Sequence, residues 1–328
     1  MRRREFITLL GGAASWPLAA RAQQGERMRR VAILMAYPPT DPEMQERVQA
    51  LRQGLGKLGW RAGENIQFDE RWTTDNMDLV RVNAAGLLEL KPDVVVATGG
   101  RVIPILMQLT RSVPIIVPGV GDPVVIGWAA SLARPGGNVT GFTFFESSVI
   151  AKYLEILKQI VPGVSQVAAI YNPDNSIGAI YARLFETFAR SLAVQTIIAP
   201  VRSVAEFDRA IESLAQQQNG GAFFLPDLTT TALRDQVTAI VARHRVPAIY
   251  SDRVLVASGG LVSYDADRTD IYRRAASYVD RVLRGEKPGD LPFQQPAKYR
   301  LTVNLKAAKA IGLEVPANVL ALADEVIE

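Results

Sequence analysis

The chain has 328 residues, of which 48% are hydrophobic and 21% are charged, and its formal net charge is +4. This composition is typical of a globular protein and excludes a collagen-like, coiled-coil or disordered chain, and the length favours two domains because single cores stop growing beyond roughly 250–300 residues. With no cysteine and one histidine, the chain has no disulfide scaffold, thiolate zinc site, iron–sulfur cluster or cysteine nucleophile, and little to build an imidazole metal site.

The first 22 residues have the features of a bacterial export signal. Arg3 and Arg4 form a twin-arginine pair, an apolar stretch follows over residues 9–20, and Ala20-Arg21-Ala22 supplies small residues for cleavage. This order is typical of a twin-arginine signal that is removed after export. A membrane anchor is disfavoured because the apolar run is too short to span roughly 30 Å of hydrocarbon, and Pro17 interrupts it.

The basic charge of the chain belongs mainly to this segment. Removal of residues 1–22 takes away four arginines and one glutamate, so the formal charge falls from +4 to +1. Without clustered lysines and arginines we expect no nucleic-acid partner. No later apolar run reaches transmembrane length, and no cysteine follows the signal to carry a lipid anchor. We therefore expect the mature protein to be soluble in the periplasm.

Short apolar strands alternate with helical segments through the first half of the mature chain. We expect strands at 31–35, 65–72, 93–97 and 114–118, and helices at 42–58, 77–90 and 102–110. Residues 40–43 (Thr-Asp-Pro-Glu) supply capping chemistry and a first-turn proline for the first of these helices. This alternation predicts a mostly parallel sheet with helices on both faces.

The same alternation begins again after Phe145. We expect helices at 147–160, 176–192, 204–216 and 230–243, and strands at 166–171, 194–199, 221–225 and 247–250. Two further strand–helix units follow, over residues 260–283 and 298–311, and we assign one of them to each sheet.

These elements predict an α/β protein with two Rossmann-like lobes and three crossings between them. We assign residues 28–145 plus 258–290 to the N-terminal lobe, and residues 146–257 plus 291–328 to the C-terminal lobe. The crossings are expected near 143–147, 251–258 and 290–297, and the glycine and proline at 259–260 and 285–296 are typical of hinge strands or loops between lobes.

Parallel α/β sheets bind ligands outside the carboxyl ends of their strands, so the candidate site is a cleft between the two lobes. The polar turns that follow the expected strands supply its candidate ligand-binding residues. These are Tyr37, Thr98, Gly99, Gly100, Gly121, Asp122, Asn172, Asp174, Asn175, Asp227, Thr229, Tyr250, Ser251 and Tyr264.

Several of these residues have a second interpretation. Asp122 is either the N-cap of the helix that follows or an acceptor for a ligand ammonium group, and the two roles are compatible. The same choice holds for the turn at 172–176, for Asp227 and for Thr229. Four tyrosines end expected strands, and we expect at least two of them to line the cleft, where aromatic rings would stack on a ligand. They are Tyr37, Tyr171, Tyr250 and Tyr264.

Motifs of catalysis and nucleotide binding are missing or misplaced. Residues 54–59 match G-x-G-x-x-G but close a helix rather than open one, so the phosphate cradle is absent. There is no phosphate-binding loop and no G-x-S-x-G turn. His244 has no carboxylate partner in its local sequence. Asn138-Val139-Thr140 is interpreted as a turn. We expect no catalytic residue, no metal and no cofactor, and hence no enzyme.

The sequence resembles the substrate-binding proteins of a bacterial ABC transporter family that includes members binding tryptophan and other aromatic amino acids. The resemblance covers essentially the whole mature chain, and residues 131–141 (SLARPGGNVTG) are its most specific part. The other matching segments are residues 51–60, 90–97, 120–123, 172–175, 260–264 and 304–313.

The resemblance implies a type I periplasmic binding protein fold, closure around a small solute, and delivery to a membrane permease driven by an ATPase subunit. We expect a monomeric solute-binding protein for an amino-acid-like or aromatic molecule. Backbone N–H groups near Thr98, Gly99 and Gly100 would bind its carboxylate, Asp122 or Asp227 its ammonium group, and tyrosines its side chain. The alternatives are a periplasmic sensing or presenting protein for a signalling partner and, less favoured, an α/β enzyme.

Overall fold

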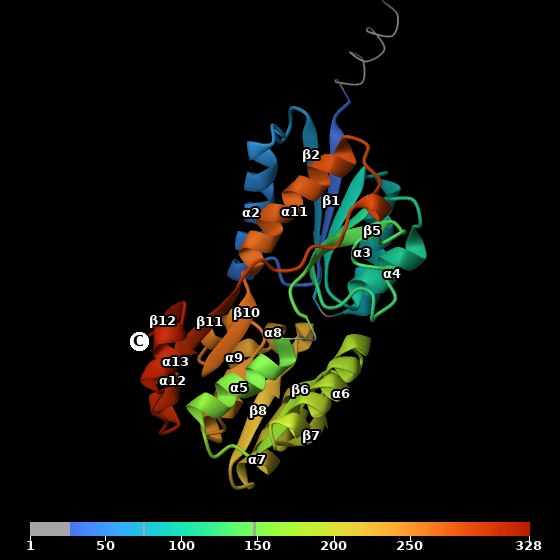
Figure 1. The fold of residues 1–328 in the computed structure, drawn as a ribbon. Helices are drawn as coiled ribbons and strands as arrows, with labels where there is room; N and C mark the ends of the chain where they lie inside the picture. Colours follow the sequence, from blue (N-terminus) through green and yellow to red (C-terminus); the bar gives the residue numbers. More distant parts are fainter. Residues whose placement is uncertain (1–26, 75, 147–148) are drawn as a thin grey trace, which may run out of the picture.

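The computed structural model describes residues 27–74, 76–146 and 149–328, so the expected export signal at residues 1–22 lies outside the described residues. The described chain forms two lobes, each built around one sheet with helices on both faces (Figure 1). In these residues, no helix has the length and apolar character needed to cross a membrane.

The sheet of the N-terminal lobe has five strands, all parallel, in the order β2-β1-β3-β4-β5. Its strands are β1 (Arg29–Met35), β2 (Ile66–Trp72), β3 (Val94–Thr98), β4 (Ile115–Val120) and β5 (Val139–Thr143). Most of β1 and β3 is fully buried, as expected for apolar runs covered on both faces. β5 lies where the sequence analysis expected a turn, because Val139–Thr143 pairs with the open edge of β4.

Two pairs of helices cover this sheet. One face carries α2 (Pro42–Lys57) and α11 (Arg268–Leu283), which lie side by side, and the other carries α3 (Met77–Glu89) and α4 (Val102–Leu109) (Figure 1). α2 begins as predicted: Pro42 occupies its first turn, and the Asp41 carboxylate accepts a hydrogen bond from the Met44 N–H at 3.2 Å. Each face therefore has its own apolar core.

The sheet of the C-terminal lobe has seven strands in the order β12-β11-β10-β9-β8-β6-β7. Its strands are β6 (Gln166–Tyr171), β7 (Gln195–Pro200), β8 (Gly220–Phe224), β9 (Ala248–Tyr250), β10 (Val262–Ala266), β11 (Tyr299–Asn304) and β12 (Glu325–Ile327). β10 and β11 are antiparallel, and the other neighbours are parallel.

The helices of this lobe follow the strands as the alternation predicted, with some additions. They are α5 (Ile150–Ile160), α6 (Ser176–Ser191), α7 (Val204–Ala215), α8 (Leu228–Ala232), α9 (Arg234–Arg243), α10 (Arg253–Ala257), α12 (Leu305–Ala310) and α13 (Ala317–Leu322). The single helix expected at 230–243 is broken at Leu233 into α8 and α9, and α10, α13 and β12 were not expected.

The chain passes between the lobes three times: from β5 to α5, from β10 to α11, and from Gln294 to β11. Gln294 still belongs to the N-terminal lobe, since its N–H donates to the Gly141 carbonyl at 3.0 Å. The short 3-10 helix at Pro288–Asp290 precedes it.

The assignment of residues 258–267 to the N-terminal lobe was wrong. β10 is a strand of the second sheet, where it pairs with β9 on one side and β11 on the other. The second crossing therefore lies between Ala266 and Arg268 rather than at 251–258. The sequence pattern did not decide between the two sheets, and the segment that returns to the first lobe is α11 with the residues that follow it to Gln294.

The contact between α2 and α11 requires a glycine. A Cβ atom at Gly54 would lie 2.6 Å from the Ala276 Cβ and 2.8 Å from the Arg273 carbonyl oxygen. Gly56, in the same helix, faces open space. Gly59 has a φ of 92° and follows the end of the helix, so the glycine motif at 54–59 closes a helix as predicted.

We predict that Gly54→Ala destabilises the protein by about 1–3 kcal/mol because the added methyl group overpacks the α2–α11 contact. Gly56→Ala is the matched control, and it should raise stability by about 0.5–1 kcal/mol through helix propensity alone. Urea unfolding of the three proteins measures both effects. Equal free energies of unfolding for the two variants would contradict the packing described here.

Candidate functional site

The two lobes face each other across a cleft at the carboxyl ends of their strands. The cleft holds about 790 Å³ of empty space, a volume that includes open solvent at its mouth. Its lining from the N-terminal lobe and first crossing comprises Tyr37, Thr98, Gly99, Gly100, Arg101, Gly119, Val120, Gly121, Ile126, Trp128, Phe144 and Arg268. The C-terminal lobe supplies Asn175, Ile177, Tyr181, Pro226, Asp227, Leu228, Thr229 and Thr231.

The loop after β3 forms a polar wall of the cleft. Gly99 has φ of 117°, in the left-handed region that favours glycine, and its carbonyl accepts the first N–H group of α4. Gly100 and Arg101 directly precede α4, whose N-terminal end carries partial positive charge. The Thr98 hydroxyl is held by a hydrogen bond to the Tyr272 hydroxyl from α11. This wall suits an anionic group of a ligand.

The opposite wall carries Asp227, the N-cap of α8. One carboxylate oxygen accepts N–H groups of Thr229 at 2.8 Å and Thr230 at 3.1 Å, and the other lies 3.4 Å from the Asn175 amide nitrogen. Asn172 supports the wall from behind by donating to the Thr229 hydroxyl at 2.9 Å. The capping bonds fix the carboxylate at the cleft surface. Among the described residues that line the cleft, Asp227 is the one with a carboxylate side chain.

Aromatic rings supply much of the apolar lining: Tyr37, Trp128, Phe144 and Tyr181. The Arg268 guanidinium lies 4.0 Å from the centroid of the Phe144 ring, a cation–π contact that holds this ring against the cleft. The cleft therefore combines polar groups at its centre with flat apolar surfaces around them.

Eight of the fourteen candidate residues line the cleft: Tyr37, Thr98, Gly99, Gly100, Gly121, Asn175, Asp227 and Thr229. Asn172 and Asp122 lie just behind them. The Asp122 carboxylate accepts hydrogen bonds from the N–H groups of Val124 and Val125 at 3.0 and 3.2 Å. Of the two roles expected for Asp122, cap and ammonium acceptor, the structure therefore shows the cap. Asp174 is at the surface, paired with Arg202 at 3.2 Å.

Tyr250, Ser251 and Tyr264 do not line the cleft. Tyr250 is fully buried and stacks on Phe224 at 4.9 Å, because the two residues are register partners in neighbouring strands. Tyr264 stacks on Tyr299 at 5.4 Å. Tyr171 packs against Gly178, where an added Cβ would lie 2.7 Å from its ring.

Of the four strand-end tyrosines only Tyr37 lines the cleft, so the expectation of at least two was wrong. The last residue of a strand points to either face of the sheet, and the alternation sends these rings into the core.

Sequence reasoning also missed Tyr181 and Arg268. Tyr181 lies one turn after Ile177 on α6, so the helical spacing of four was a usable signal, whereas Arg268 reaches the cleft through the fold of the second crossing.

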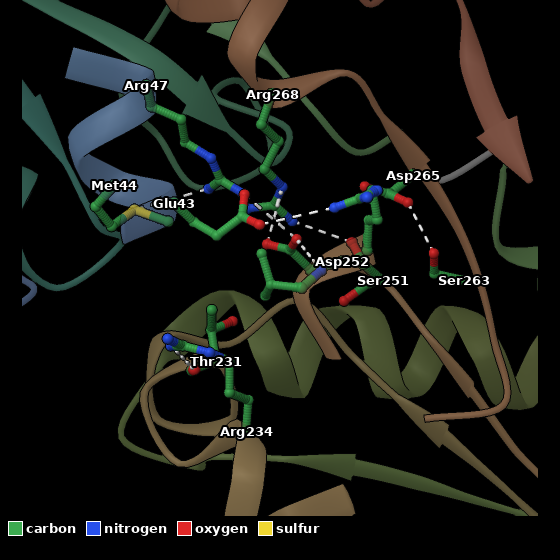
Figure 2. Close-up of polar contacts among 12 residues, drawn as sticks. Glu43, Met44, Arg47, Thr231, Arg234, Ser251, Asp252, Ser263, Asp265 and Arg268 are labelled. Carbon is green, nitrogen blue, oxygen red and sulfur yellow. Dashed lines mark hydrogen bonds and ion pairs between the residues drawn. The ribbon is translucent and has the colours of Figure 1, made fainter. Parts of the chain in front are cut away.

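A buried cluster of charges lies beside the cleft (Figure 2). The Asp252 carboxylate is 3.5 Å from the Arg47 guanidinium and 3.2 Å from that of Arg268, and the side chains of Asp252 and Arg47 are 2% and 6% exposed. Burial alone would raise the pKa of Asp252, but the guanidiniums of Arg268 and Arg47 outweigh it and lower that pKa. Arg268 also donates to the Ser251 carbonyl at 3.0 Å.

The start of α2 is tied to the other lobe by two further ion pairs. Asp41 lies 2.9 Å from Arg234, and Glu43 lies 3.7 Å from Arg253, which itself forms a two-pronged pair with Glu325 at 2.5 and 2.6 Å. Together with Arg47, these residues place three charged side chains of α2 and its cap against the C-terminal lobe.

His244 has a partner that the local sequence did not reveal. Its Nε2 lies 2.9 Å from the Asp208 carboxylate, which also binds Arg243 at 2.6 Å. This partner is distant in the sequence, since Asp208 lies on α7 and His244 follows α9, and neither residue lines the cleft. In the part of the chain that the structure describes, no group of three or more acidic, histidine or cysteine side chains is arranged to hold a metal.

Comparisons with known proteins agree with this architecture. The family model described as ABC transporter substrate binding protein matches residues 31–327. A protein named tyrosine-binding protein, from Clostridioides difficile (strain R20291), is 25% identical over 285 residues, which are 87% of this chain and 80% of that protein.

Two solved structures share the whole described fold. A conserved domain protein from Vibrio cholerae has a TM-score of 0.85 and 25% identity, covering 92% of this chain and all of that chain. An ABC domain in complex with L-Trp from Streptococcus pneumonia has the same TM-score and coverage with 22% identity. The two-lobed α/β fold is confirmed.

We predict that Asp252→Asn destabilises the protein by roughly 3–5 kcal/mol, because it leaves two buried guanidiniums without their counter-charge. Asparagine still caps α10, where Asp252 accepts the Val254 N–H at 3.2 Å, so the change isolates the charge. Asp270→Asn, which removes an exposed pair with Arg273, should cost about 1 kcal/mol or less. Similar losses for both variants in urea unfolding would contradict the assigned role.

Asp265 makes the free energy of unfolding depend on pH. Burial first, and then the charge of Asp252, raise the pKa of Asp265 to about 7, against the opposing effects of Arg268 and of the Ser263 hydroxyl at 3.0 Å. The charge of Asp265 in turn raises the pKa values of Tyr153 and Arg253.

Because this pKa is raised on folding, protonated Asp265 contributes stability that is complete below pH of about 4 and is lost as the pH rises through 7. We predict that the free energy of unfolding of the unchanged protein, minus that of Asp265→Asn, falls between about pH 5 and pH 8. Urea unfolding across this range measures the difference, and a constant value would refute the prediction.

Proposed function

The chain belongs to the ABC transporter substrate-binding protein family, and from this premise we propose that it captures an amino-acid-like or aromatic solute in the interlobe cleft and delivers it to a membrane permease. The protein binds a small molecule as its family does, and the proposal concerns which solute it takes and where the solute goes.

The observation that carries the proposal is the opposition of two polar walls. Gly100 and Arg101, at the positive end of α4, line the cleft beside Thr98, and Asp227 lines it from the C-terminal lobe. An α-amino acid carries a carboxylate and an ammonium group on the same α-carbon, so it can contact both walls at once. Its carboxylate binds the N-terminal lobe and its ammonium group binds Asp227.

The apolar surfaces around these groups suit a flat side chain. Tyr37, Trp128 and Phe144 line the cleft, and aromatic ligands stack on such rings. The names of two similar proteins point the same way: one is a tyrosine-binding protein, and the other was solved in complex with L-Trp.

Closure supplies the affinity. The solute binds one lobe first, and the second lobe rotates onto it about the three crossings. Contacts that exist only in the closed form, including the bridge from Arg101 to Asp227 through the solute, shift the population toward that form. The solute leaves chemically unaltered, and the protein acts as a carrier rather than an enzyme.

The twin-arginine pattern at Arg3 and Arg4 and the family membership support export to the periplasm before signal cleavage. There the closed, loaded monomer delivers the solute to the permease, and an ATPase subunit drives transport.

The proposal is tested by thermal unfolding of the mature protein with amino acids, aromatic acids and nucleosides. We predict that L-tyrosine or L-tryptophan, at about 100 times its dissociation constant, adds about 2.7 kcal/mol of stability. A significant shift with nucleosides but none with amino acids or aromatic acids would overturn the proposed solute class.

Asp227→Asn sharpens this test, because asparagine keeps the α8 cap while removing the charge. The affinity for L-tyrosine should fall about tenfold or more, and that for its deaminated analogue, 3-(4-hydroxyphenyl)propionate, should not change. Asp174→Asn, at the surface of the same lobe, is the control and should leave both affinities unchanged.

A further inference from the structure

One hydrogen bond joins the two lobes directly at the cleft. The Tyr181 hydroxyl, on α6 of the C-terminal lobe, accepts the backbone N–H of Asp122 of the N-terminal lobe at 2.8 Å. Tyr181 also lines the cleft. A side chain that contacts both the opposite lobe and the ligand space is suited to link solute binding with closure.

Gly121 is shaped for this contact. A Cβ atom at Gly121 would lie 2.1 Å from the Tyr181 hydroxyl oxygen and 2.4 Å from the Ile177 Cδ1. Any larger residue at 121 would therefore hold the lobes apart. The two side chains from α6 fill the space that the missing side chain leaves, so this fit exists only when the lobes are closed.

The position and the protonation of the Tyr181 hydroxyl are both fixed. The ring is 1% exposed and packs against Phe145, with the ring centroids 4.6 Å apart. Burial raises the pKa of Tyr181 well above its ordinary value, so the hydroxyl keeps its proton. The oxygen accepts the Asp122 N–H, and among the described residues no hydrogen bond uses the hydroxyl proton.

We propose that Tyr181 is a positioning residue whose hydroxyl accepts the Asp122 N–H across the lobes and donates its own proton to an oxygen of the bound solute. This inference rests on the proposed function. The inference adds to that function a second contact that depends on closure. It also requires the solute to have a hydrogen-bond acceptor beside α6, such as a carboxylate or hydroxyl oxygen.

The two hydrogen bonds strengthen each other. A hydroxyl that accepts one hydrogen bond is polarised and becomes a better donor in the next, so the chain from N–H to hydroxyl to solute oxygen is cooperative. Because the first bond forms only in the closed arrangement, the solute binds more tightly to the closed form than to the open form. That difference in affinity is what shifts the population toward closure.

Three variants test the proposal. Tyr181→Phe removes the hydroxyl and keeps the ring, and Gly121→Val blocks the fit. Tyr250→Phe is the matched control, since its hydroxyl is buried in the same lobe and has no hydrogen-bond partner among the described residues. L-tyrosine is the probe, and its binding is followed by the tryptophan fluorescence of the protein, because Trp128 lines the cleft.

For Tyr181→Phe we expect the dissociation rate of L-tyrosine to rise about two- to tenfold while the association rate stays within about twofold. Gly121→Val should weaken binding by more than about tenfold. Small-angle scattering of the ligand-free proteins should give a larger radius of gyration for both variants than for the unchanged protein. Tyr250→Phe should match the unchanged protein in every measurement.

Unchanged dissociation rate and radius of gyration in both cleft variants would overturn the inference. An increase in dissociation rate without any change in scattering would also overturn it, because it would make Tyr181 a simple ligand contact. If the unchanged protein binds no amino acid or aromatic acid, the proposed solute class fails. The scattering comparison still decides whether the Tyr181 contact holds the lobes together.

Discussion

The arrangement of the two lobes depends on one buried carboxylate. Asp252 lies between the guanidiniums of Arg47 and Arg268, and removing these three charges from water costs several kcal/mol per ion unless they meet. Arg47 comes from α2, Arg268 from the start of α11, and Asp252 from the C-terminal lobe. The charges are therefore satisfied only where the two lobes and the second crossing come together. Arg268 extends this constraint to the cleft, where its guanidinium packs on the Phe144 ring.

The same residues build the fold and the candidate site. Asp227 and Asp122 each cap the turn or helix that follows a strand, and these bonds place one carboxylate in the cleft and the other behind it. Gly99 and Gly121 allow the backbone to approach the opposite lobe, where a side chain would strain the loop or collide with Tyr181. Capping chemistry and glycine placement thus position the groups that would face a solute, without elements dedicated to binding.

Much of this could be read from the sequence because strands, helices and their turns follow local patterns. The buried runs at β1 and β3, the cap at Asp41 and the turns at Thr98 and Asp227 lie where expected. The pattern failed where a choice depends on distant partners. β10 fits either sheet, Tyr250 points to the core because of its register with Phe224, and Arg268 reaches the cleft only because α11 returns from the second lobe.

The return of α11 makes the first lobe discontinuous in the chain. Half of one apolar face of its sheet stays uncovered until residues 268–283 are available, and the Trp60 indole finds its Asp280 partner across 220 positions. Contacts of such long sequence separation are formed late and slowly. During synthesis, the C-terminal lobe can therefore gather five of its seven strands while the first lobe still waits for a helix, so the lobe made first is completed only when its partner is largely built.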